Sequence, residues 1–189
     1  MSNVAGKSRK EIRQAKRQRQ GRLWQLALGA AGVAILAVIG YFIWDAVRPK
    51  PGESVPLQGR AHIQVSDPHE PYNSDPPTSG AHAAPVNEGF YSEPLPDENL
   101  VHNLEHGYVI IWYNCERLTD GDCDTLEAQI RDVIDRNGKK LIAVPRPTLD
   151  VPIAITSWGR LDKLDQFDET EIVTFIKEFR NKAPEPGAP

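Results

Sequence analysis

The sequence predicts a mixed α+β domain that follows a single apolar N-terminal helix. Three observations support this fold class: an uncharged apolar run over residues 26–44, a proline-rich stretch over residues 61–96, and alternating buried-strand and amphipathic-helix patterns after Gly107. We therefore divide the chain into a basic tail at 1–22, a transmembrane helix at 23–47, a linker at 48–60, a domain at 61–182 and a disordered tail at 183–189.

The helix at 23–47 is expected to cross a membrane. Residues 26–44 carry no charge, and at ~1.5 Å per residue they span a hydrocarbon core of roughly 30 Å. Trp24 lies at one end, and Tyr41 and Trp44 lie at the other, where amphipathic rings prefer the headgroup level. A cleaved signal peptide is the alternative, but its apolar region is usually roughly 7–15 residues long, and "FIWDAVRPK" lacks a small-residue cleavage site.

Charge on the two sides of this helix predicts its orientation. Residues 1–22 carry eight Lys/Arg and one Glu, whereas residues 51–189 carry 12 basic and 24 acidic side chains. By the positive-inside rule the N-terminus stays cytoplasmic and the C-terminal domain is extracytoplasmic, in a single-pass protein of the cell membrane. The lipid bilayer is thus the first expected partner. No aromatic residue is interleaved with the basic tail, which argues against nucleic acid as a partner.

The chain has two cysteines, Cys115 and Cys123, and both fall in the predicted extracytoplasmic domain. An oxidising compartment favours a disulfide, and closing a loop of nine residues contributes about 2–3 kcal/mol. The spacing matches neither C-x-x-C redox chemistry nor a zinc knuckle. We expect a structural disulfide, with free or metal-bound thiols as the alternative.

The domain begins with a long irregular stretch. Residues 61–96 contain seven prolines and little apolar periodicity, and a loop of this length is usually functional or disordered. A short helix is expected over 98–106, with Asp97 as its N-cap and Gly107 just after its end.

Regular structure continues to the end of the domain. We predict a central strand at 108–114, a helix at 123–137, strands at 140–147 and 153–160, and a closing helix at 168–180. A helix between two buried strands favours a right-handed parallel crossover, and the short turn between the next two strands favours an antiparallel hairpin. This β-α-β-β-α order is similar to that of thioredoxin-like domains.

Two histidines on the short helix are the strongest candidates for chemistry. His102 and His106 lie four residues apart, so they share a helix face, with Cβ atoms about 5–6 Å apart, and can bind one metal ion. Glu105 projects to one side as a further ligand or as a base. The alternative is a pair of structural histidines at a helix C-terminus, where the helix dipole favours a cation.

The same residues form the pattern H-x-x-E-H, which is found in one class of zinc peptidases. Peptidase motifs lie within long core helices, whereas this helix is a turn or two long and ends at Gly107. The pattern therefore favours a metal site without peptidase activity, and we assign no catalytic residue.

Two blocks, "PPTSGAH" at 76–82 and "VHNLEHG" at 101–107, resemble the signature of the bacterial domain-of-unknown-function family 3105 (DUF3105). The similarity covers about residues 60–180 and implies a membrane-anchored domain without an established activity. It favours the histidines of these two blocks over His69, and it matches His62 to the histidine that opens the family pattern. The cysteines are not part of that pattern.

Within the first block two prolines and Gly80 form a rigid carrier for His82. We predict a metal site formed by His82, His102 and His106, with His62 and Glu105 as further candidates. Imidazole ligands suit zinc or copper(II), and Met1 is the only methionine, which excludes a thioether-rich copper(I) site.

Two other functions remain open. The first is a non-enzymatic envelope module that binds a protein partner and uses its histidines structurally. The second is a metal-dependent hydrolase with Glu105 as the base. The sequence names no substrate.

Overall fold

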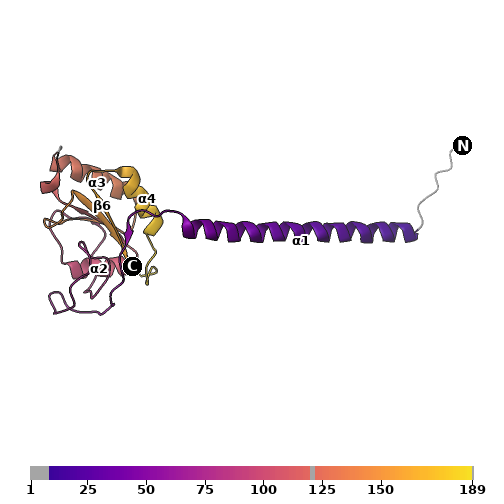
Figure 1. Cartoon of the computed structure of the whole chain (residues 1–189), viewed down its shortest axis with the longest axis horizontal. Helices are drawn as coiled ribbons and strands as arrows, with labels where there is room; N and C mark the ends of the chain where they lie inside the picture. Colours follow the sequence, from indigo (N-terminus) through magenta and orange to yellow (C-terminus); the bar gives the residue numbers. More distant parts are fainter. Residues whose placement is uncertain (1–8, 120–121, 189) are drawn as a thin grey trace. The chain divides into compact units, whose positions relative to one another are not determined.

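The computed structural model describes residues 9–119 and 122–188, and it divides the chain into two compact units, Met1–Pro49 and Lys50–Pro189 (Figure 1). The first unit is dominated by helix α1 (Arg9–Val47). Within α1 the segment Arg19–Val47 is long and apolar enough to cross a membrane. Its length and composition fit a membrane anchor or a signal sequence.

The second unit is a mixed α+β domain around a six-stranded sheet, with strand order β1-β6-β5-β3-β4-β2. Among the described residues the strands are β1 (Glu53–Ser54), β2 (Gly89–Phe90), β3 (Val109–Tyr113), β4 (Leu141–Pro145), β5 (Ile153–Ser157) and β6 (Arg160–Leu164). The helices of this unit are α2 (Asp97–Glu105), the 3-10 helix η1 (Cys115–Arg117), α3 (Cys123–Asn137) and α4 (Glu169–Phe179).

Strand β3 lies in the middle of the sheet, and all five of its residues are buried, as the apolar run predicts. Its alternate side chains belong to two cores, since side chains of a strand point to opposite faces in turn. Val109, Ile111 and Tyr113 pack with α3 and α4, whereas Ile110 and Trp112 pack with α2. The sheet therefore has helices on both faces, with α3 and α4 on one and α2 on the other (Figure 1).

The connection from β3 through α3 to β4 is the predicted parallel unit. The predicted hairpin between β4 and β5 is wrong: β5 pairs antiparallel with β3 instead. The other edge of β4 is occupied by β2, so the chain passes from β4 to the free edge of β3. The hairpin joins β5 to β6, a strand that the sequence analysis missed by extending one strand across the turn at Gly159.

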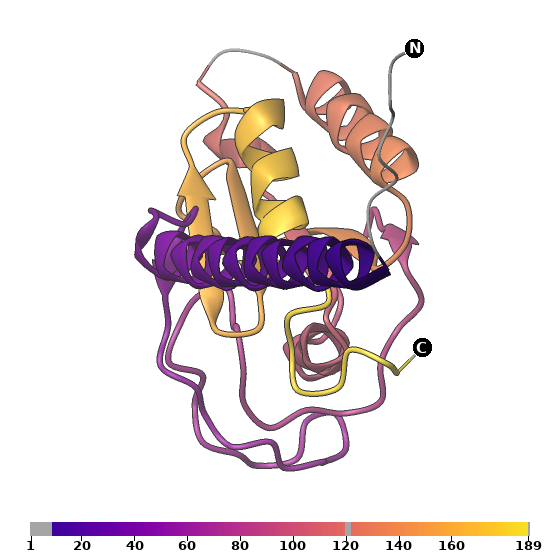
Figure 2. The ribbon, with the colours of Figure 1, turned by 90° about the vertical axis from the view of Figure 1, so that its right-hand side faces the viewer.

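Both flanks of the domain differ from their predicted state. Residues 50–60, expected in a linker, belong to the domain, because β1 pairs with β6 and Val55 is buried. Residues 183–188, expected in a disordered tail, pass around α2, which Figure 2 shows nearly end-on. The Glu185 amide donates a hydrogen bond to the Glu105 carbonyl, which ties this segment to the helix.

The predicted disulfide between Cys115 and Cys123 is present. The closing helix α4 buries its apolar face as predicted, and Gly138 ends α3 with a positive φ of 81°. Asp122 caps α3 by accepting a hydrogen bond from the Thr125 amide.

Candidate metal centre

Helix α2 presents its polar side chains to the long loop because its apolar side chains face the sheet. Leu100 and Leu104 are fully buried against β3 and its neighbours. The helix ends where Gly107 adopts a φ of +82°, and a Cβ there would lie 2.8 Å from the Asn181 Cα atom. Glycine is therefore required at this turn, as the sequence pattern indicates.

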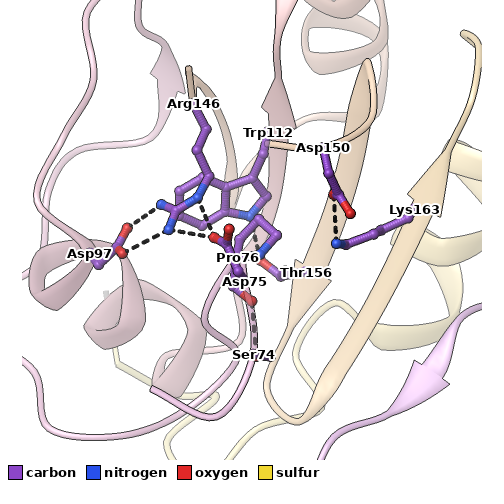
Figure 3. A network of polar contacts seen from close by, with 9 residues as sticks. All are labelled: Ser74, Asp75, Pro76, Asp97, Trp112, Arg146, Asp150, Thr156 and Lys163. Carbon is purple, nitrogen blue, oxygen red and sulfur yellow. Dashed lines mark hydrogen bonds and ion pairs between the residues drawn. The ribbon is translucent and has the colours of Figure 1, made fainter. Parts of the chain in front are cut away.

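The helix does not begin as predicted. Its N-cap is Pro96, which offers no capping side chain, and Asp97 is the first helical residue. Asp97 instead accepts two hydrogen bonds from the Arg146 guanidinium, at 2.6 and 3.1 Å. Arg146 also binds Asp75 in the loop, as Figure 3 shows, so one side chain at the end of β4 holds both the helix and the loop.

Backbone hydrogen bonds join the two ends of loop segment 62–82, which carries His62 and His82. A parallel β-bridge joins His62 to His82: the His82 amide donates to the Ala61 carbonyl, and the Ile63 amide donates to the His82 carbonyl, both at 2.9 Å. Gly80 adopts a φ of +137°, where Tyr72 packs against it and donates a hydrogen bond to the Ala81 carbonyl. The "PPTSGAH" block is therefore the rigid carrier of His82 that its prolines and glycine predict.

These two elements bring four of the five predicted ligands into one group, and the fifth, His106, lies beside His102. Three rings, those of His62, His82 and His102, have centroids 4.5 to 5.2 Å apart. One ligand atom from each of them and one carboxylate oxygen of Glu105 lie within 4.8 Å of one another. The Nε2 atom of His106 lies 3.1 Å from that of His102. Two nitrogens on one tetrahedral zinc ion are about 3.3 Å apart, so this pair can share an ion.

Backbone carbonyls orient two of the rings. His82 Nδ1 lies 2.9 Å from the Gly80 carbonyl oxygen, and His102 Nδ1 lies 2.5 Å from that of Ala83. An Nδ1–H group that donates to a carbonyl leaves Nε2 with a free lone pair, the form that binds metals. Both lone pairs point into the cluster.

The contact between His82 and Glu105 joins the loop to helix α2 inside the cluster. His82 Nε2 and Glu105 Oε2 lie 2.9 Å apart, and both side chains are almost fully buried. The distance is that of an ion pair, yet neither atom has a hydrogen bond of acceptable geometry. A ring nitrogen and a carboxylate oxygen at this distance can share a cation, either a proton or a metal ion.

The other carboxylate oxygen of Glu105 binds a cation of the protein. Arg60 Nη1 lies 3.1 Å from Glu105 Oε1, so the two oxygens have different partners. Asn103, also on α2, binds the loop backbone at Val86 through both its amide oxygen and its amide nitrogen. These contacts hold the helix and the loop in register beside the cluster.

Burial and the neighbouring rings lower the pKa of His102 below its ordinary value. Partial desolvation is the larger cause, and the charges that His82, His106 and His62 would carry add to it. A lowered pKa keeps the imidazole neutral, which is the state required of a metal ligand. The lowered pKa of His102 therefore favours the form of this ring that can bind a metal ion.

His69, which the family resemblance ranked below the histidines of the two blocks, lies outside this cluster. Its ring packs on Tyr72, and its Nε2 lies 3.9 Å from Glu98. Arg60 and Arg146 also contribute to the site, although neither was among the predicted residues. No local signal marks them, since their partners are 45 and 49 residues away in the sequence.

The fold and the cluster together define the class of protein. It is an α+β protein with a buried group of three histidines and one glutamate that could hold a metal ion. Comparison with protein families agrees with the similarity of the two signature blocks. The family model "Protein of unknown function (DUF3105)" matches residues 64–189, and the chain belongs to that family. His62 lies two residues before the matched range. No curated protein and no solved structure matches the chain.

Proposed function

We propose that the protein is a single-pass, membrane-anchored extracytoplasmic domain that binds a transition metal ion through His62, His82, His102 and Glu105. The convergence of ligand atoms from these four residues within 4.8 Å of one another carries this proposal. His106 lies close enough to His102 to serve as a further ligand.

The membrane anchor rests on three observations. The segment Arg19–Val47 has the length and composition of a membrane span, and the charge bias across it predicts a cytoplasmic N-terminus. The disulfide is consistent with an oxidising compartment for the domain.

The donor set favours zinc or copper(II). Three imidazole nitrogens and one carboxylate oxygen suit a tetrahedral zinc site, and imidazole also suits copper(II). Calcium prefers six to eight oxygen ligands, which this cluster lacks.

Binding is favoured over hydrolysis for two reasons. A catalytic zinc site keeps an open position for water, whereas four or five side chains of this chain already converge here. Glu105 would be the base of a hydrolase, but its carboxylate is buried between Arg60 and His82.

A thioredoxin-like arrangement of the domain also remains a proposal. The parallel β3–α3–β4 unit and the β5–β6 hairpin followed by α4 support it, while the extra strands β1 and β2 extend the sheet at its two edges.

Metal analysis of the full chain tests the proposed function. The wild type and a His102→Ala/His106→Ala variant would be purified in detergent and titrated with zinc(II) and copper(II). We expect about one ion per chain in the wild type and none in the variant. Equal metal content in the two proteins would contradict the proposal.

An envelope interaction module with structural histidines is the second candidate. The acidic surface of the domain, with 24 acidic and 12 basic residues over 51–189, would suit a basic protein partner. Unchanged folding and stability after exhaustive chelation would favour this candidate.

A further inference from the structure

A second group of metal-ligand side chains lies at the opposite end of β3 from the histidine cluster. Cys115 opens η1 just after β3, and Cys123 opens α3. Glu127 lies one turn further along α3, and its Oε1 is 3.8 Å from Cys123 Sγ. One ligand atom from each of these three residues lies within 4.8 Å of the others. We call these three residues the cysteine corner.

The carboxylate of the corner is held in place by neighbours that are not ligands. Glu127 Oε1 accepts a hydrogen bond from the Tyr113 hydroxyl at 3.3 Å, and Oε2 accepts one from Arg131 at 3.1 Å. Burial and the Glu127 charge raise the pKa of Tyr113, so that its hydroxyl remains a donor. Contacts of this kind orient ligand side chains in metal sites.

Each cysteine is also positioned by contacts that do not depend on the disulfide. Asn114 caps η1 by accepting a hydrogen bond from the Glu116 amide, and it donates to the carbonyls of Pro147 and Leu149. Asp122 caps α3 through the Thr125 amide at 2.6 Å. These contacts hold each cysteine at the first turn of its own helix.

Space for an ion exists beside the sulfur atoms. A pocket of about 210 Å³ is lined by both cysteines, Glu127, Tyr113 and Ser92, among others. A metal ion and a water molecule fit into this volume.

We propose that reduction of the Cys115–Cys123 disulfide creates a second metal site, with two thiolates and the Glu127 carboxylate as ligands. In the reduction, a dithiol transfers two electrons and two protons to the disulfide, which becomes two thiols, while the dithiol closes to its own disulfide. A metal ion then displaces the two thiol protons. The dipole at the start of α3 favours the Cys123 thiolate.

Such a donor set selects a metal that prefers sulfur, of which zinc(II) is the natural candidate and cadmium(II) a spectroscopic probe. The site would bind no metal while the disulfide is intact, and it would bind metal once reduction has freed both thiols. Metal binding at this corner would thus report the redox state of the compartment. It is independent of the histidine cluster, which keeps its ligands in either redox state.

Cadmium(II) titration of the full chain in detergent tests the inference, with thiolate-to-metal charge-transfer absorption as the readout. The wild type would be measured oxidised and after reduction by a dithiol that is then removed without oxygen, with two free thiols per chain confirmed by thiol titration. We expect the absorption with one cadmium ion in the reduced protein only. It should persist in His102→Ala/His106→Ala, which separates this inference from the proposed function.

Two single substitutions on α3 test the ligand set without removing a cysteine. Glu127→Gln should weaken cadmium binding at least about tenfold, whereas the exposed neighbour Asp124→Asn should leave it unchanged. The inference is overturned if the reduced wild type, with both thiols free, shows no charge-transfer absorption. It is also overturned if Glu127→Gln binds cadmium as tightly as the wild type.

Discussion

Arg146 donates two hydrogen bonds to Asp97, at 2.6 and 3.1 Å, and so joins the end of β4 to the first turn of α2. The same guanidinium binds Asp75 in the loop that carries His82, and it lies 5.1 Å from the centre of the Trp112 ring (Figure 3). The loop and the helix supply all the ligands of the candidate centre. Arg146 therefore fixes their separation without being a ligand.

Replacement of Arg146 by methionine should destabilise the domain and weaken metal binding. The change leaves Asp97, which is three-quarters buried, without its partner. Loss of hydrogen bonds to a charged group costs about 1.5–3 kcal/mol. Because helix and loop lose their common anchor, metal affinity should also fall, by about tenfold. Thermal unfolding and metal titration of the full chain in detergent measure the two effects.

Lys163→Met is the matched control for this substitution. Lys163 binds Asp150 at 2.7 Å, but this pair lies on the surface and touches neither the loop nor α2 (Figure 3). It should cost less than about 1 kcal/mol and leave metal affinity unchanged. Equal effects of the two substitutions would show that Arg146 has no special role at the centre.

Glu105→Gln should reduce metal affinity at least about tenfold while the domain stays folded. The amide keeps the size of the side chain and one oxygen, but it removes the negative charge that faces His82. Isothermal titration with zinc(II) measures the change. Glu98→Gln, on the same helix but outside the cluster, should bind as the wild type does. Unchanged affinity in Glu105→Gln would leave a site made of histidines alone.

Metal binding should stabilise the folded domain. An ion that binds only the folded state adds about 2.7 kcal/mol at a concentration one hundred times its dissociation constant. The unfolding temperature of the protein should rise when zinc(II) is added and should return to its original value after chelation. His82→Ala should abolish the rise, whereas His69→Ala, outside the cluster, should retain it. A rise of the same size in His82→Ala would place the ion elsewhere.

Local patterns predicted most of the elements, but they could not predict how distant elements meet. The spacing of His102 and His106 and the rigid block before His82 pointed to the region of the candidate centre, because each is a short-range pattern. The contact of Arg60 with Glu105 and the pairing of β5 with β3 in place of β4 depend on long-range packing. Such packing leaves no periodic signal in the sequence. The short strand β1 and the tail at 183–188 were missed for the same reason, since their bonds are formed with remote backbone.

Asp162 on β6 should make the domain less stable as the pH rises. Burial raises its pKa above the ordinary value of 3.8, and the charge of Glu171 raises it further. The folded state therefore binds this proton more tightly than the unfolded state does. By linkage, stability falls as the pH increases from 3.8 through the raised pKa, and the loss is complete above it. Asp162→Asn should remove this loss and be more stable than the wild type at neutral pH.

Asp150 provides a control of opposite sign in the same hairpin region. A hydrogen bond from Lys163 lowers its pKa, so its contribution is present at neutral pH and is lost as the pH falls through the lowered value. Unfolding temperatures of both asparagine variants should be compared with the wild type from acidic to neutral pH. As the pH rises, Asp162→Asn should become more stable than the wild type and Asp150→Asn less stable. If Asp162→Asn is no more stable than the wild type at neutral pH, other contacts of the folded protein offset the cost of burying the Asp162 carboxylate.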